Sequence, residues 1–163
     1  MREITKNLFI GNQDDYEKEV RYRNDWFIIH ACKEPYHRQA LQYTGRAAPK
    51  THPEYLIARR EGKLILNLVD VDNVAYISQE IIDAAISEIE RNIKERKVLV
   101  HCNQGQSRSA TIGLLYLAHI GIITNSSFIE AEQEFKSLYP QYSPANGMRE
   151  FANLNWKKYL KHE

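Results

Sequence analysis

The chain has 163 residues, of which 43% are hydrophobic and 26% are charged, and this length and composition suit one globular domain with a single core, spanning residues 1–163. The formal net charge of +1 argues against nucleic-acid binding driven by overall charge, and no run of about 18 apolar residues is present that would predict a membrane span. Two cysteines and an N-terminus without a recognisable secretory signal predict a protein of the reducing cytoplasm.

Apolar runs along the chain alternate between strand-like and helix-like patterns. Short runs rich in β-branched residues predict buried strands at about 8–10, 26–29, 64–69 and 97–100. Helical spacing of apolar residues predicts a long helix after Ser78, followed by helices at about 110–118, 126–138 and 146–160, with Asn125 or Ser126 as the cap of the second of these three. Strands that alternate with helices indicate an α/β fold in which helices flank a central, mainly parallel sheet.

A polar loop links the strand at 97–100 to the apolar helix at 110–118. It reads His101-Cys102-Asn103-Gln104-Gly105-Gln106-Ser107-Arg108-Ser109. A tight loop between a strand and a helix can aim several backbone N–H groups at one anion, and an arginine adds a planar fork of donors. These donors also favour the thiolate of a cysteine at the base of the loop. The sequence therefore predicts a phosphate cradle with a nucleophile in its floor, with phosphate held by Asn103, Gln104, Gly105, Gln106, Ser107 and Arg108.

The pattern His-Cys-x5-Arg-Ser resembles the signature of the cysteine-dependent protein tyrosine phosphatases, and it is most similar to their dual-specificity branch. Two flanking stretches support the resemblance. Residues 4–12 are similar to the opening strand of these phosphatases, and residues 143–148, followed by Phe151, resemble the segment that begins their last helix.

The resemblance implies hydrolysis of a phosphomonoester through a phosphocysteine intermediate, without a metal or other cofactor. It assigns Cys102 as the nucleophile and Arg108 as the phosphate clamp. Ser109 would help the thiolate to depart, and His101 would order the loop and favour the thiolate. A phosphorylated protein is the expected substrate. Two alternatives stay open: the same chemistry on a nucleotide, sugar or inositol phosphate, and a module that binds phosphorylated ligands without hydrolysing them.

Two aspartates could serve as the general acid that protonates the leaving oxygen. Asp70 and Asp72 lie 32 and 30 residues before Cys102, and both spacings fit the family. Asp72 with the following Asn73 resembles the family pattern of an aspartate before a small polar residue. Asp70 is the first carboxylate beyond the predicted strand, where the backbone is most rigid, and we favour it slightly.

A long insertion separates the second predicted strand from the third. More than thirty residues, about 30–62, stand where the family has a short connection. Connections of this length are usually functional or disordered, and the tyrosines and prolines here favour an ordered element folded over the sheet edge near the cradle. Its charged side chains either face water or meet an anionic substrate, and the substrate-side candidates are Lys33, His37, Arg38 and Arg46. Its histidines have cationic neighbours, so no metal site is expected.

The second cysteine, Cys32, ends a strand predicted to lie near the cradle strand. It is either a buried apolar thiol or the partner of a disulfide with Cys102 that would protect the nucleophile from over-oxidation.

Overall fold

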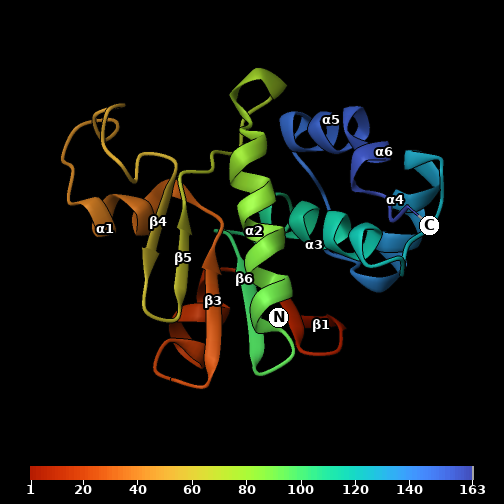
Figure 1. The fold of residues 1–163 in the computed structure, drawn as a ribbon, viewed down its shortest axis with the longest axis horizontal. Helices are drawn as coiled ribbons and strands as arrows, with labels where there is room; N and C mark the ends of the chain where they lie inside the picture. The colour runs from red at the N-terminus through yellow and green to blue at the C-terminus, as the bar shows by residue number, and fades with distance from the viewer. Residues whose placement is uncertain (163) are drawn as a thin grey trace.

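A six-stranded sheet forms the centre of the protein in the computed structural model, which describes residues 1–162 (Figure 1). The strand order is β1-β2-β6-β3-β5-β4. The strands are β1 (Arg2–Thr5), β2 (Leu8–Gly11), β3 (Trp26–His30), β4 (Ile57–Arg60), β5 (Lys63–Leu66) and β6 (Lys97–His101). The four inner strands are parallel and the two edge strands are antiparallel to their neighbours. The predicted α/β fold with a mainly parallel sheet is confirmed.

Helices α2 to α6 pack on one face of the sheet. They are α2 (Gln79–Asn92), α3 (Arg108–His119), α4 (Phe128–Leu138), α5 (Asn146–Leu154) and α6 (Trp156–Tyr159). Figure 1 shows α2 crossing in front of the central strands, with α3 to α6 gathered toward the β1 edge. The side chains of Phe27, Ile29, Val98 and Val100 join the helices in the larger apolar core, because alternate residues of a strand face the same side.

The opposite face of the sheet carries a smaller core beneath short helical segments. Residues of the central strands that alternate with the first set, such as Ile28 and Leu99, pack here with Tyr16 and Tyr36. Tyr16 lies in η1 (Asp15–Val20) and Tyr36 in η2 (Lys33–His37). Burial on both faces explains why the inner strands read as continuous apolar runs rather than as alternating ones.

Several predicted boundaries are corrected. Strands β1 and β4 were not predicted, and the strand predicted at 64–69 ends at Leu66. The predicted last helix is divided into α5 and α6, because Asn155 leaves the helical conformation between them. Helix α4 is capped by Ser127, whose hydroxyl accepts from the Glu130 N–H at 3.3 Å, instead of by Asn125 or Ser126. The predicted cap Ser78 does accept from a first-turn amide of α2.

The insertion at 30–62 is ordered and contains η2, the helix α1 (Arg38–Leu41) and strand β4. Strand β4 pairs with β5 and forms the outer edge of the sheet, so part of the insertion extends the sheet instead of folding over it. The loop between α1 and β4 lies at the end of the sheet where the parallel strands finish (Figure 1). Within residues 1–162, no helix has the length and apolarity needed to cross a membrane.

Candidate active site

The cradle lies at the carboxyl end of β6, where open α/β sheets usually bind their ligands. Cys102 directly follows the strand and Arg108 is the first residue of α3. A cavity of about 390 Å³ opens in front of them. It is lined by Asp70, Cys102, Asn103, Gln104, Gln106, Ser107, Arg108, Ser143, Pro144 and Ala145.

The backbone of the cradle turns its carbonyl groups toward the surrounding protein. The carbonyl of Asn103 accepts from the Gln13 N–H at 3.2 Å, and that of Gln106 accepts from the Ser143 N–H at 2.8 Å. The Tyr139 hydroxyl donates to the Gly105 carbonyl at 2.5 Å. By contrast, no backbone N–H of residues 103–108 donates to a protein group within the described chain. This arrangement leaves a ring of donors for an anion.

Gly105 allows this arrangement because it has a positive φ of 73° and lies against the end of β2. A Cβ at this position would stand 2.8 Å from the Gly11 carbonyl oxygen, which is closer than real Cβ atoms approach. Glycine is therefore required at the centre of the motif for two reasons, the positive φ angle and the close contact with β2.

The sulfur of Cys102 lies on the floor of the cradle, and the residue as a whole is 2% exposed. Its Sγ is 3.1 Å from the hydroxyl of Ser109, which also donates to the Gly11 carbonyl at 3.2 Å. A thiolate cannot donate a hydrogen bond, so in that state the Ser109 hydroxyl has to turn its proton from Gly11 to the sulfur.

The guanidinium of Arg108 binds one group of the cradle and one group of the segment after β5. Its Nη1 donates to the Leu68 carbonyl at 3.0 Å and its Nη2 donates to Asn103 Oδ1 at 2.6 Å. Its Nε is buried and has no hydrogen-bond partner within the described residues. A buried donor of this kind is costly unless a ligand accepts from it.

The two aspartates differ in where they lie. Asp70 lines the cavity and accepts from the Ser107 hydroxyl at 2.7 Å. That hydroxyl in turn accepts from the Ala145 N–H at 2.9 Å, so it joins the cradle to the aspartate loop and to the start of α5. Both aspartates are exposed, but Asp72 does not line the cavity, and its backbone carbonyl accepts from the Asn146 side chain at 2.9 Å.

Helix α5 holds the aspartate loop through a close backbone contact. The Gly147 N–H donates to the Val71 carbonyl at 3.0 Å. A Cβ at Gly147 would stand 2.2 Å from that carbonyl oxygen, so only glycine permits the contact. The residues just before Asp72 are thus fixed by a helix more than seventy positions later.

His101 is fully buried behind the cradle. Its Nδ1 is 3.3 Å from the Cys102 carbonyl oxygen, and its Nε2 is 2.6 Å from Nδ1 of His30. Burial lowers the pKa of His101 to about 4, so the ring is neutral near pH 7. Sequence reasoning missed His30, because its partner lies 71 positions away and no local pattern marks it.

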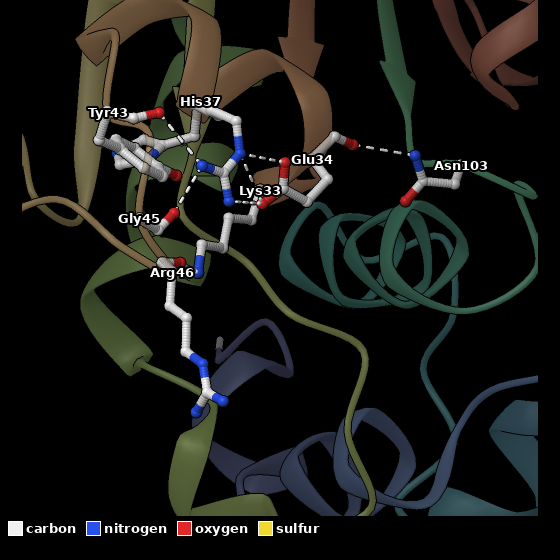
Figure 2. Close-up of polar contacts among 8 residues, drawn as sticks. Lys33, Glu34, His37, Tyr43, Gly45, Arg46 and Asn103 are labelled. Atoms are coloured by element: carbon white, nitrogen blue, oxygen red, sulfur yellow. Dashed lines mark hydrogen bonds and ion pairs between the residues drawn. The ribbon is translucent and has the colours of Figure 1, made fainter.

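Three of the four basic residues proposed for the substrate side are bound by other groups of the insertion, mainly backbone carbonyls and the Glu34 carboxylate (Figure 2). Arg38 pairs with the Glu34 carboxylate and donates to the carbonyls of Tyr43 and Gly45. Lys33 donates from Nζ to the Arg46 carbonyl. None of Lys33, His37, Arg38 and Arg46 lines the cavity.

His37 is fully buried, where its ring contacts the Tyr43 hydroxyl at 3.0 Å and the Glu54 carbonyl at 2.9 Å. Its assignment to the substrate side is therefore corrected to a structural one. Arg46 is exposed, and Figure 2 shows its guanidinium pointing away from the other side chains of the insertion.

The insertion contacts the cradle through Asn103, a link that the sequence did not indicate although it assigned Asn103 to the phosphate cradle. The Asn103 Nδ2 donates to the Glu34 carbonyl at 3.0 Å (Figure 2). It also donates to Gln13 Oε1 at 2.9 Å. Because Asn103 Oδ1 accepts from Arg108, one amide links the insertion to the guanidinium.

Cys32 is buried and not in a disulfide, and burial raises the pKa of its thiol to about 12. Such a thiol is almost entirely protonated at neutral pH. Within the part of the chain that the structure describes, no group of three or more His, Cys, Asp or Glu side chains is arranged to hold a metal ion.

No protein-family model matches the sequence, and no curated protein matches it either. Solved structures do match. A human tyrosine phosphatase-like serine/threonine/tyrosine-interacting protein is similar with a TM-score of 0.65 at 20% identity, covering 98% of this chain and 97% of that one. The structure of DUSP15 is similar with a TM-score of 0.63 at 17% identity, covering 98% and 89%. A mouse putative dual-specificity phosphatase, crystallised with zinc tungstate, is similar with a TM-score of 0.56 at 22% identity, covering 99% and 92%. The chain thus has the fold of the dual-specificity phosphatases.

Proposed function

We propose that the protein hydrolyses phosphomonoesters through a phosphocysteine intermediate formed on Cys102. One observation carries the proposal: a cysteine, an arginine and an aspartate line one cavity, and the N–H groups of the loop between the cysteine and the arginine have no protein acceptor among the described residues. The bound phosphate would accept from these amides and from Arg108, including its partnerless Nε. Tungstate, with which the mouse neighbour forms a complex, is a tetrahedral oxyanion like phosphate and is a suitable probe of the cradle of this protein.

In the first step, the Cys102 thiolate attacks phosphorus, and the bond between phosphorus and the ester oxygen breaks. Asp70 donates a proton to the departing oxygen. In the second step, Asp70 takes a proton from water while the oxygen of that water attacks phosphorus. The S–P bond then breaks, and the Ser109 hydroxyl donates a hydrogen bond to the departing thiolate, 3.1 Å away in this structure. Inorganic phosphate is released and Cys102 and Asp70 return to their starting states.

Asp70 is proposed over Asp72 because it lines the cavity and is held by Ser107. His101 would orient the Cys102 carbonyl, and Asn103 would steady Arg108 before phosphate binds. Gln104, Gly105, Gln106 and Ser107 would contribute mainly their backbone N–H groups to the phosphate.

We propose a phosphorylated protein side chain as the substrate. A ligand with several phosphates needs several cations, and among the residues that the structure describes Arg108 is the one cation in the cavity lining. The other lining side chains are uncharged apart from Asp70. This charge distribution favours a monoester with one phosphate over inositol polyphosphates and nucleoside polyphosphates.

The test is release of p-nitrophenol from its phosphate ester, with a chelator present, by the wild type and by Cys102→Ser. Activity is expected in the wild type and is expected to vanish in the variant. Cys32→Ala is the matched control, since it removes the other buried cysteine and should retain activity. Inactive wild-type protein that is folded and binds tungstate would favour a phosphate-binding module. If the wild type is active, phosphotyrosine peptides should be cleaved faster than inositol polyphosphates. The reverse order would contradict the proposed substrate class.

A further inference from the structure

Two buried histidines meet directly behind the nucleophile. His30 ends β3 and His101 ends β6, and the two residues are register partners in neighbouring parallel strands. Their rings are nearly perpendicular, with centroids 4.8 Å apart, and His30 Nδ1 is 2.6 Å from His101 Nε2. His30 is 1% exposed and the mechanism above does not use it.

Hydrogen-bond geometry decides where the proton between the two rings belongs. Two ring nitrogens at this separation share one proton, so one donates and the other accepts. The second nitrogen of His101, Nδ1, lies 3.3 Å from the Cys102 carbonyl oxygen, which can only accept. A neutral His101 that donates to this carbonyl carries its one proton on Nδ1, so its Nε2 must accept from His30 Nδ1–H.

Burial keeps both rings neutral and so makes this assignment strict. Burial is the main reason that the pKa of each histidine is lowered, and the mutual repulsion of their charged forms, with Lys63 and Arg21 nearby, lowers that of His30 further. If His101 carried its proton on Nε2 instead, the lone pair of Nδ1 would face the lone pairs of the Cys102 carbonyl.

The tyrosines around the pair do not compete for these nitrogens. Tyr16 of η1 stacks on His101 at 5.1 Å, and Tyr36 of η2 stacks on His30 at 4.1 Å. Their hydroxyls bond elsewhere: Tyr36 donates to Glu17 at 2.7 Å and Tyr16 accepts from Lys63 at 3.0 Å. The two tyrosine rings cover the histidine pair without bonding to its nitrogens, so His30 is the partner of His101 Nε2.

We propose that His30 is a positioning residue of this site, which fixes the His101 tautomer that holds the Cys102 carbonyl and with it the backbone of the nucleophile. The catalytic half of this inference rests on the proposed phosphatase function. The tautomer assignment does not.

A pair of His30 variants separates positioning from packing. His30→Asn keeps an amide donor close to the place of Nδ1 but loses the ring that stacks on Tyr36. His30→Phe keeps a stacking ring but has no donor. If His30 positions His101, His30→Phe should lower kcat roughly tenfold or more with a much smaller change in KM, while His30→Asn retains most of kcat in spite of its greater loss of stability. His30→Phe as the more active of the two would show a packing role and overturn the proposal. His119→Phe, at a partly exposed histidine paired with Glu90, is the control and should not change kcat.

Nitrogen-15 NMR of the imidazole rings near pH 7 tests the tautomer without any substrate. In the wild type, His101 should carry its proton on Nδ1 and have an unprotonated Nε2, and the Nε2-protonated form should rise in His30→Phe. A wild-type His101 protonated on Nε2 would overturn the inference even in an active enzyme. An inactive wild type with the expected tautomer would instead contradict the proposed function and the catalytic half of the inference, while confirming the assignment of the pair.

Discussion

The cradle and the insertion at 30–62 are both segments with polar and basic side chains, yet they use these residues in opposite ways. In the insertion, Arg38 is occupied by Glu34 and by two backbone carbonyls, and His37 is buried between a hydroxyl and a carbonyl. In the cradle, the carbonyls are bonded outward, while the amides and Arg108 Nε have no protein partner within the described chain. Donors left without protein partners, more than the number of charges, distinguish a loop built for an anion from one that stabilises itself.

The contrast between the cradle and the insertion is tested most strongly at Arg108. Arg108→Lys keeps the charge but loses the fork of donors, including the partnerless Nε, so kcat/KM for p-nitrophenyl phosphate should fall roughly a thousandfold. Steady-state kinetics measure the loss. A variant with near-normal kcat/KM would mean that a positive charge alone is sufficient to bind the phosphate. The insertion also carries positive charges, so the contrast would then fail.

The next largest effect is expected at the aspartate that shares the cavity. Asp70→Asn should lower kcat roughly a hundredfold for an ester with a poor leaving group, such as phenyl phosphate, because that oxygen needs a proton. The loss should be much smaller for p-nitrophenyl phosphate. Asp72→Asn is the matched variant two positions away and should leave both substrates nearly unaffected; the opposite pattern would transfer the role to Asp72.

Ser109 should give a smaller and more specific effect. Ser109→Ala removes the hydroxyl that lies 3.1 Å from Cys102 Sγ, so departure of the thiolate in the second step should slow roughly tenfold. Rapid-quench kinetics should then show a burst of p-nitrophenol followed by a slower steady rate, which reflects accumulated phosphocysteine. An unchanged second step would remove Ser109 from the mechanism.

Acid should destabilise the protein through the buried histidine behind the cradle, His101. The folded-state pKa of His101 is lowered to about 4, below the unfolded value of about 6.5, so the unfolded chain binds more protons between these values. The free energy of unfolding should therefore fall as the pH falls through this window, by about 3 kcal/mol for His101 alone. Urea unfolding between pH 6.5 and 4 measures the slope, and His101→Asn should flatten it by about 1 kcal/mol per pH unit. An equally steep slope in that variant would place the cause elsewhere.

The insertion should give the smallest effect on catalysis. Arg38→Ala removes contacts to Glu34, Tyr43 and Gly45, so it should lower the free energy of unfolding slightly and leave kcat within twofold. Thermal unfolding and p-nitrophenyl phosphate kinetics on the same sample check both halves. A large loss of kcat would show that the link through Asn103 carries the state of the insertion to Arg108.

The parts of the molecule that sequence could predict are those whose cause is local. The strand, cradle and helix at 97–118 follow each other directly, and each has its own pattern. Strands β1 and β4 are four residues long and rich in polar side chains, so they become strands only by pairing at the sheet edges. The placement of His30 opposite His101, and the different places of Asp70 and Asp72, depend on strand register and on the Gly147 contact with Val71. No local pattern contains those contacts.

The Ser107 hydroxyl, which joins Asp70 to the Ala145 amide, also has a consequence for the order in which the site is built during synthesis. The cradle is translated first, but its carbonyls and its aspartate loop are held by Tyr139, Ser143, Ala145 and Gly147. When Cys102 and Arg108 have emerged from the ribosome, these supporting residues have not yet been added to the nascent chain. The cradle is therefore completed only after residues 139–147 have emerged and α5 has packed.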